Sequence, residues 1–106
     1  MNKFIKKWIK ALRSGDYKQA TGKLVKGTGS SRSYCCLGVA GSLLSAETGK
    51  KFKAFTSKDA ECLNNVGLKA TGLTDRTQST LIGMNDGGKS FKQIANFLEK
   101  KFKEKS

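Results

Sequence analysis

The sequence predicts a small α+β domain that is mainly helical, with four to five helices and a minor β-hairpin. Apolar residues recur at helical spacing in several segments along the chain. A glycine-rich stretch in the first third separates two short runs that suit paired strands. The 106 residues leave room for one modest core, and neither a proline nor a repeat divides the chain. We therefore assign residues 1–106 to a single domain.

The N-terminal segment predicts an amphipathic helix over residues 3–13, which Gly15 would end. Its apolar stripe consists of Phe4, Ile5, Trp8, Ile9 and Leu12. A basic helix that carries tryptophan could also lie on a membrane surface. Because such a stripe more often packs into a core, we favour core packing here.

The next segment is polar and rich in glycine, and within it we expect residues 23–26 and 32–34 to pair as a short hairpin. A buried helix is predicted over residues 36–47, with Gly49 as its stop. Small residues such as Gly41 would let this helix approach its neighbours closely.

In the C-terminal half, the alternating pattern of residues 50–55 predicts a short edge strand. Thr56 suits the N-cap of a helix over residues 57–65, with Gly67 beyond its end.

Two further helices are predicted near the C-terminus. Thr74 suits the N-cap of a helix over about 75–84, and residues 85–88 then form a turn. A capping box that begins at Ser90 predicts the last helix over 91–103. We expect one shared core built around Trp8, Leu37, Leu44, Ile94 and Leu98.

The formal net charge is +13, from 21 lysines and arginines against 8 acidic residues. This balance favours an anionic partner: a nucleotide, a nucleic acid, a membrane surface or an acidic protein. No apolar run is long enough to span a membrane, and lysines interrupt any signal-peptide core at the start. Three cysteines, an odd number, indicate reduced thiols rather than a disulfide framework. We expect a cytoplasmic protein without stable membrane insertion.

The residues available for catalysis are few. The absence of histidine removes the usual triads and imidazole acid–base chemistry, and the eight acids are scattered. Cys36 could be a nucleophile at a helix N-terminus near Arg32, but a buried small apolar role for Cys35 and Cys36 is the better interpretation. Asp86 is best explained by turn chemistry. We expect no catalytic residues, no metal site and no cofactor.

The glycine-rich loop is the best candidate for a binding site. Glycine backbones expose N–H groups that bind anions, and the helix that begins near Cys36 would add its positive end. No Walker pattern is present. A mobile surface loop with solvated lysines explains the segment equally well. If the loop binds a ligand, the residues expected to supply charge, hydrogen bonds and a stacking face are Lys18, Gln19, Lys23, Lys26, Arg32 and Tyr34.

Two segments carry a resemblance to a known group of proteins. They are Tyr34-Cys35-Cys36-Leu37-Gly38-Val39-Ala40 and Met84-Asn85-Asp86-Gly87-Gly88-Lys89-Ser90-Phe91. With Trp8 and the residues around it, they resemble a widespread family of small proteins encoded by tailed bacteriophages, whose members mostly lack an assigned activity. The resemblance covers nearly the whole chain, and it implies action inside an infected cell.

These observations predict a small non-enzymatic phage protein that acts in the host cytoplasm, in host takeover or counter-defence. The mechanism we favour is binding and sequestration of a phosphate-bearing nucleotide by residues 17–36. Two alternatives stay open: an accessory protein that binds DNA or RNA, and an inhibitor of an acidic host protein. The sequence also leaves a homo-oligomer open, because ligand sites in so small a chain often lie between subunits.

Overall fold

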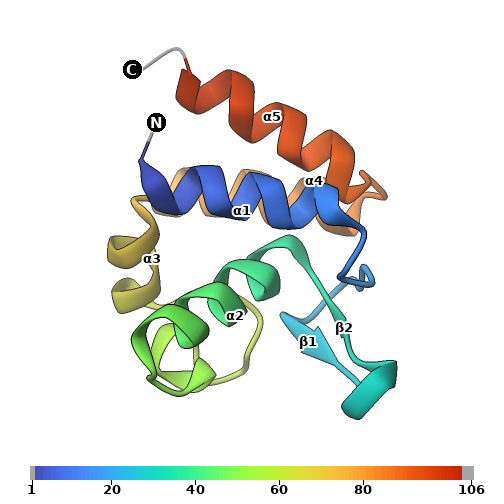
Figure 1. The fold of residues 1–106 in the computed structure, drawn as a ribbon, viewed down its shortest axis with the longest axis vertical. Coiled ribbons are helices and arrows are strands. Elements are labelled where there is room, and N and C mark those ends of the chain that lie inside the picture. The colour runs from blue at the N-terminus through green and yellow to red at the C-terminus, as the bar shows by residue number, and fades with distance from the viewer. Residues whose placement is uncertain (1, 104–106) are drawn as a thin grey trace.

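A computed structural model describes residues 2–103, which form five α-helices, two short 3-10 helices and one two-stranded hairpin (Figure 1). In chain order these are α1 (Lys3–Ser14), β1 (Val25–Lys26), η1 (Gly29–Ser31), β2 (Ser33–Tyr34), α2 (Cys36–Thr48), η2 (Phe52–Phe55), α3 (Asn65–Thr71), α4 (Asp75–Asp86) and α5 (Phe91–Lys103). The predicted α+β class, with several helices and a minor hairpin, is confirmed.

Helix α1 forms as its apolar stripe predicts. Asn2 caps it, because its side-chain Oδ1 accepts a hydrogen bond from the Ile5 N–H at 2.7 Å. Gly15 ends it in the left-handed conformation, with φ of 83°. The buried stripe faces the rest of the molecule, and α5 runs alongside α1 in the opposite direction (Figure 1).

The predicted hairpin is present but short. Val25 pairs with Tyr34 and Lys26 pairs with Ser33 in an antiparallel register. The preceding chain also pairs with β2, but through a parallel bridge between Gln19 and Tyr34, in which the Ala20 N–H donates to the Tyr34 carbonyl at 2.7 Å and the Tyr34 N–H donates to the Lys18 carbonyl at 2.7 Å. The segment before the hairpin is therefore fixed against β2.

Helix α2 is the most buried helix, and its residues 36–41 are all buried. Gly38 explains how it packs so closely: a Cβ at this position would lie 1.8 Å from the Leu24 carbonyl oxygen. The backbone before β1 thus rests directly on the first turn of α2. Gly49 ends the helix with φ of 74°, as predicted.

The sequence-based assignment was wrong between residues 50 and 65. Residues 50–55 do not form an edge strand, because residues 52–55 wind into η2. Residues 57–64 form turns instead of the helix expected over 57–65. Helix α3 begins only at Asn65.

Gly67 was expected to lie beyond the end of a helix, but it lies inside α3. A Cβ on Gly67 would come within 2.4 Å of the Phe55 carbonyl oxygen. The glycine is therefore needed for close approach between α3 and η2, and it does not act as a stop signal.

The last two helices begin at the N-caps that the sequence predicts. The Thr77 N–H donates to Thr74 Oγ1 at 3.1 Å, and the Ser90 capping box closes with a 3.2 Å bond from the Gln93 N–H to Ser90 Oγ. Helix α4 runs two residues further than predicted, to Asp86. Asn85 and Asp86 therefore belong to its last turn and not to the loop that follows.

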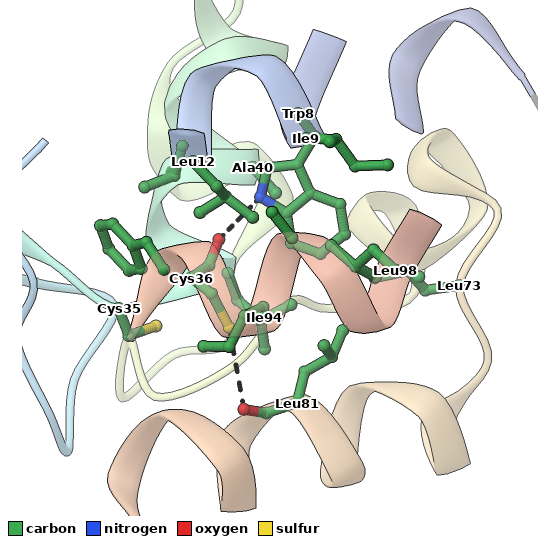
Figure 2. Close-up of a cluster of buried hydrophobic side chains, with 14 of the residues drawn as sticks. Trp8, Ile9, Leu12, Cys35, Cys36, Ala40, Leu73, Leu81, Ile94 and Leu98 are labelled. Carbon is green, nitrogen blue, oxygen red and sulfur yellow. Dashed lines mark hydrogen bonds between the residues drawn. The ribbon is translucent and has the colours of Figure 1, made fainter. Parts of the chain in front are cut away.

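The core joins the helices that the sequence pattern indicated. Trp8, Leu37, Ile94 and Leu98 are buried in one cluster, as expected. Leu44 is also buried but lies outside that cluster. Figure 2 shows the centre of the cluster, where the Trp8 indole Nε1 donates to the Cys36 carbonyl at 2.9 Å.

Within residues 2–103, no helix has both the length and the apolar character required to cross a membrane.

Candidate functional site

A groove lies between the hairpin and the second half of α2, with η2 closing one side. Its volume is about 580 Å³. The residues that line it are Val25, Gly27, Arg32, Tyr34, Ser42, Ser45, Ala46 and Phe52. We call this the hairpin groove.

The alternation of side chains along the two strands decides which residues reach the hairpin groove. Arg32 and Tyr34 are two residues apart, and both line it. Lys26 follows the lining residue Val25 and does not line the groove. Its ammonium instead lies beside Gly22, where a Cβ would be 3.9 Å from Lys26 Nζ.

The groove has two aromatic walls. The Phe52 ring rests on α2 at Gly41, where a Cβ would come within 2.7 Å of the ring. The Tyr34 ring meets the Tyr17 ring edge to face, with centroids 5.2 Å apart. Burial, with smaller contributions from Tyr34 and Asp16, raises the pKa of Tyr17. Each of these two rings therefore packs against another part of the protein.

The polar side of the groove comes from α2 and from Arg32. Ser42 and Ser45 lie one helical turn apart and face the hairpin. The Ser45 hydroxyl donates to the Lys50 carbonyl at 2.7 Å, which leaves its oxygen able to accept a further bond. Arg32 is exposed at the opposite wall, where its guanidinium is accessible to an anion.

The structure brings together only two of the six residues that the sequence singled out. Arg32 and Tyr34 share the groove, whereas Lys18, Lys23 and Lys26 are exposed elsewhere. Gln19 does not line the groove, and its side chain makes hydrogen bonds within the fold. Its Nε2 donates to Asn85 Oδ1 at 3.0 Å and to the Lys89 carbonyl at 2.7 Å.

The N-terminus of α2 does not contribute a positive helix end to this groove, in contrast to the expectation from sequence. The Cys36 N–H donates to Asn85 Oδ1 at 3.2 Å, and the Gly38 N–H donates to Cys35 Sγ at 3.4 Å. The first turn of α2 is buried, and the groove lies against the second half of the helix. Any anion bound here would depend on side chains for its contacts.

The two adjacent cysteines are core residues. Cys36 is fully buried, and its Sγ donates to the Leu81 carbonyl at 3.8 Å (Figure 2). Burial raises the pKa of the Cys36 thiol well above its usual value and also raises the pKa of the Cys35 thiol. Since a thiolate is the nucleophile, this environment supports the buried apolar role over the catalytic one.

Sequence reasoning missed Phe52 and the serines of α2 as groove residues. The sequence pattern predicts an edge strand at Phe52, whereas Phe52 begins η2, so its position against α2 could not be foreseen. Ser42 and Ser45 differ from the apolar residues around them in a buried helix, and that contrast was the available signal. Among residues 2–103, no three His, Cys, Asp or Glu side chains gather closely enough to share a metal ion.

The fold is that of a small, mainly helical α+β domain, and its hairpin groove combines Arg32 with two aromatic walls. By sequence, the chain belongs to the family described as "Domain of unknown function (DUF8296)", whose model matches residues 1–71. The match ends with α3, so α4 and α5 lie outside it. No curated protein and no solved structure matches the chain.

Proposed function

We propose that this is a non-catalytic protein that binds and sequesters a phosphate-bearing nucleotide in the hairpin groove. The observation that carries the proposal is the pairing of one guanidinium with two aromatic rings in one cleft, from Arg32, Tyr34 and Phe52. Guanidinium binds phosphate in a bidentate manner, and aromatic rings stack on bases. A volume of about 580 Å³ suits a ligand of nucleotide size.

The non-catalytic part of the proposal rests on the residues available. The chain has no histidine. The Cys35 and Cys36 thiols are buried, and burial raises their pKa values. No acidic side chain lines the groove among the described residues. A bound nucleotide would therefore be held rather than cleaved.

The cellular setting we propose is the cytoplasm of an infected bacterial cell. The support is the resemblance of residues 34–40 and 84–91 to small tailed-phage proteins. A phage protein that sequesters a signalling nucleotide would act in host takeover or counter-defence.

The test is calorimetric titration of the protein with a panel of cyclic and linear nucleotides. Arg32→Gln and Lys26→Gln form a matched pair, because each removes one positive charge from the same hairpin, on opposite faces. We expect Arg32→Gln to weaken binding about 10- to 100-fold, the range for a lost charge-assisted hydrogen bond. Lys26→Gln should change it less than about twofold, as is typical of an exposed, screened charge.

Phe52→Leu tests the aromatic wall. It should weaken the binding of nucleotides more than the binding of inorganic phosphate, because phosphate has no ring to stack. Equal losses in Arg32→Gln and Lys26→Gln would mean that diffuse charge binds the anion and that the groove is not the site. An absence of binding across the panel would also refute the proposal.

Nucleic-acid binding is a second candidate, favoured by the net charge of +13. Contacts with many phosphates release many counterions, so affinity for DNA or RNA should fall steeply with salt. A nucleotide with few phosphates should lose much less affinity over the same salt range. Titrations with duplex DNA and RNA at several salt concentrations separate the two candidates.

A further inference from the structure

A second groove lies on another part of the surface, between α1 and α5. Its volume is about 490 Å³, and it is lined by Lys6, Ile9, Lys10, Arg13, Ser14 and Glu99. We call it the interhelix groove. The two helices run side by side in opposite directions, so the groove follows their shared edge (Figure 1).

The cations of this groove form a regular row. Lys6, Lys10 and Arg13 are spaced four and three residues apart, which places them along one edge of α1. At a rise of about 1.5 Å per residue, Lys6 and Lys10 are about 6 Å apart along the helix axis. Neither lysine is paired with a carboxylate of residues 2–103.

The third cation already holds a carboxylate. Arg13 Nη1 donates to Glu99 Oε2 at 3.2 Å, and its Nη2 donates to Glu99 Oε1 at 3.3 Å. These bonds and the Arg13 charge, with a smaller contribution from Lys103, lower the pKa of the Glu99 carboxyl. This edge of α1 therefore already stabilises one carboxylate, that of Glu99, in its charged form.

The rest of the lining distinguishes between kinds of anion. Ile9 and the methylene stems of the cationic side chains give the groove an apolar floor. None of the described lining residues is aromatic, so a nucleic acid base would find no ring for stacking. An apolar floor with a cationic rim complements a polypeptide in which apolar and acidic side chains share one face.

From this charge complementarity we propose that the interhelix groove docks an acidic, amphipathic helical segment of another protein. Its carboxylates would pair with Lys6 and Lys10, as Glu99 pairs with Arg13, and an apolar side chain would contact the floor, chiefly the methylene stems, since Ile9 is only 5% exposed. Glutamates four residues apart on the incoming helix have the same axial spacing as the two lysines. This site is separate from the hairpin groove and does not depend on nucleotide binding.

The test uses a synthetic helical peptide with glutamates four residues apart and leucines on the same face. Its affinity for the whole protein is measured by fluorescence anisotropy. The double variant Lys6→Gln/Lys10→Gln should weaken peptide binding by about tenfold or more. A matched control, Lys58→Gln/Lys69→Gln, removes the same charge from exposed sites outside both grooves and should change affinity less than about twofold.

Two further probes complete the design. The same peptide with glutamine in place of glutamate should lose binding, and a fluorescent oligothymidylate reports on nucleic acid. Equal weakening in the two double variants would overturn the proposal, because it would show only non-specific attraction. Tighter binding of the oligonucleotide with the same dependence on Lys6 and Lys10 would assign the groove to nucleic acid instead. Thermal melting of each variant shows that loss of binding does not reflect loss of fold.

Discussion

One side chain, Asn85, links three parts of the chain. It is 1% exposed, and its Oδ1 accepts hydrogen bonds from Gln19 Nε2 at 3.0 Å and from the Cys36 N–H at 3.2 Å. Its Nδ2 donates to the Ala20 carbonyl at 2.7 Å. The neighbouring Asp86 Oδ1 accepts from the Gly22 N–H at 3.0 Å. The end of α4 therefore fixes both the start of α2 and the segment that leads into the hairpin.

Replacing Asn85 with alanine should destabilise the protein by about 2–6 kcal/mol. The change leaves the buried Cys36 N–H and Ala20 carbonyl without this partner, at about 1–3 kcal/mol for each unsatisfied group. Urea unfolding followed by Trp8 fluorescence measures the loss. Asp86→Asn is the control, since the exposed side chain keeps an oxygen acceptor and should change stability by less than about 1 kcal/mol. A similarly small loss for Asn85→Ala would mean that water replaces the missing amide.

At the scale of elements, glycines let α2 pack without a side chain in the way. Gly38 meets the Leu24 backbone, and Gly41 meets the Phe52 ring that forms a wall of the hairpin groove. The Leu24 carbonyl also accepts from the Cys35 N–H at 3.0 Å, so the contact at Gly38 includes a hydrogen bond. Helix α2 therefore positions the hairpin through its backbone.

Gly38→Ala should destabilise the protein by about 1–3 kcal/mol, although alanine favours a helix over glycine by about 1 kcal/mol. The reason is that the new Cβ would lie 1.8 Å from a backbone oxygen that cannot move without disturbing the hairpin. Gly83→Ala in α4 is the matched control, because a Cβ there meets nothing within 4 Å. We expect Gly83→Ala to stabilise the protein by about 0.5–1 kcal/mol. Thermal melting of both variants measures the difference, and a stabilised Gly38→Ala protein would contradict the close approach.

The elements that sequence reasoning predicted are those with local signals. Helices α1 and α5 have apolar stripes, and α4 and α5 begin at recognisable caps. Local signals failed where distant contacts decide the structure. Phe52 alternates with lysines like a strand residue, but its ring is held on α2 at Gly41.

The candidate site was foreseen only in part for the same reason. The hairpin could be predicted, and strand alternation then places Arg32 and Tyr34 on one face. The opposite wall comes from α2 and η2, which the sequence did not connect to the hairpin. The hydrogen-bond partners of Gln19, Asn85 and the Lys89 carbonyl, are at least 66 residues away in the chain, so local sequence could not reveal these contacts.

At the scale of the whole molecule, the chain depends on helices that lie beyond the family match. The match ends at residue 71, but Leu81 of α4 and both Ile94 and Leu98 of α5 are fully buried in the same cluster as Trp8. Fully burying one such side chain contributes about 1.5–3 kcal/mol. Their loss would remove a large share of the 5–15 kcal/mol that is typical of a small domain.

We therefore expect a fragment of residues 1–71 not to fold on its own, although the family model covers it. Without α5, the buried stripe of α1 would face water, and without Asn85 the start of α2 would lose its side-chain acceptor. Trp8 is 0% exposed in the full chain, so its fluorescence reports the outcome. The full chain should show blue-shifted emission and one cooperative unfolding transition, whereas the fragment should show the red-shifted emission of a solvated indole and no transition. Adding a separate peptide of residues 72–106 should restore the blue shift if α4 and α5 supply the missing core. Cooperative unfolding of the fragment alone would show instead that residues 1–71 are a domain and that α4 and α5 are accessory to it.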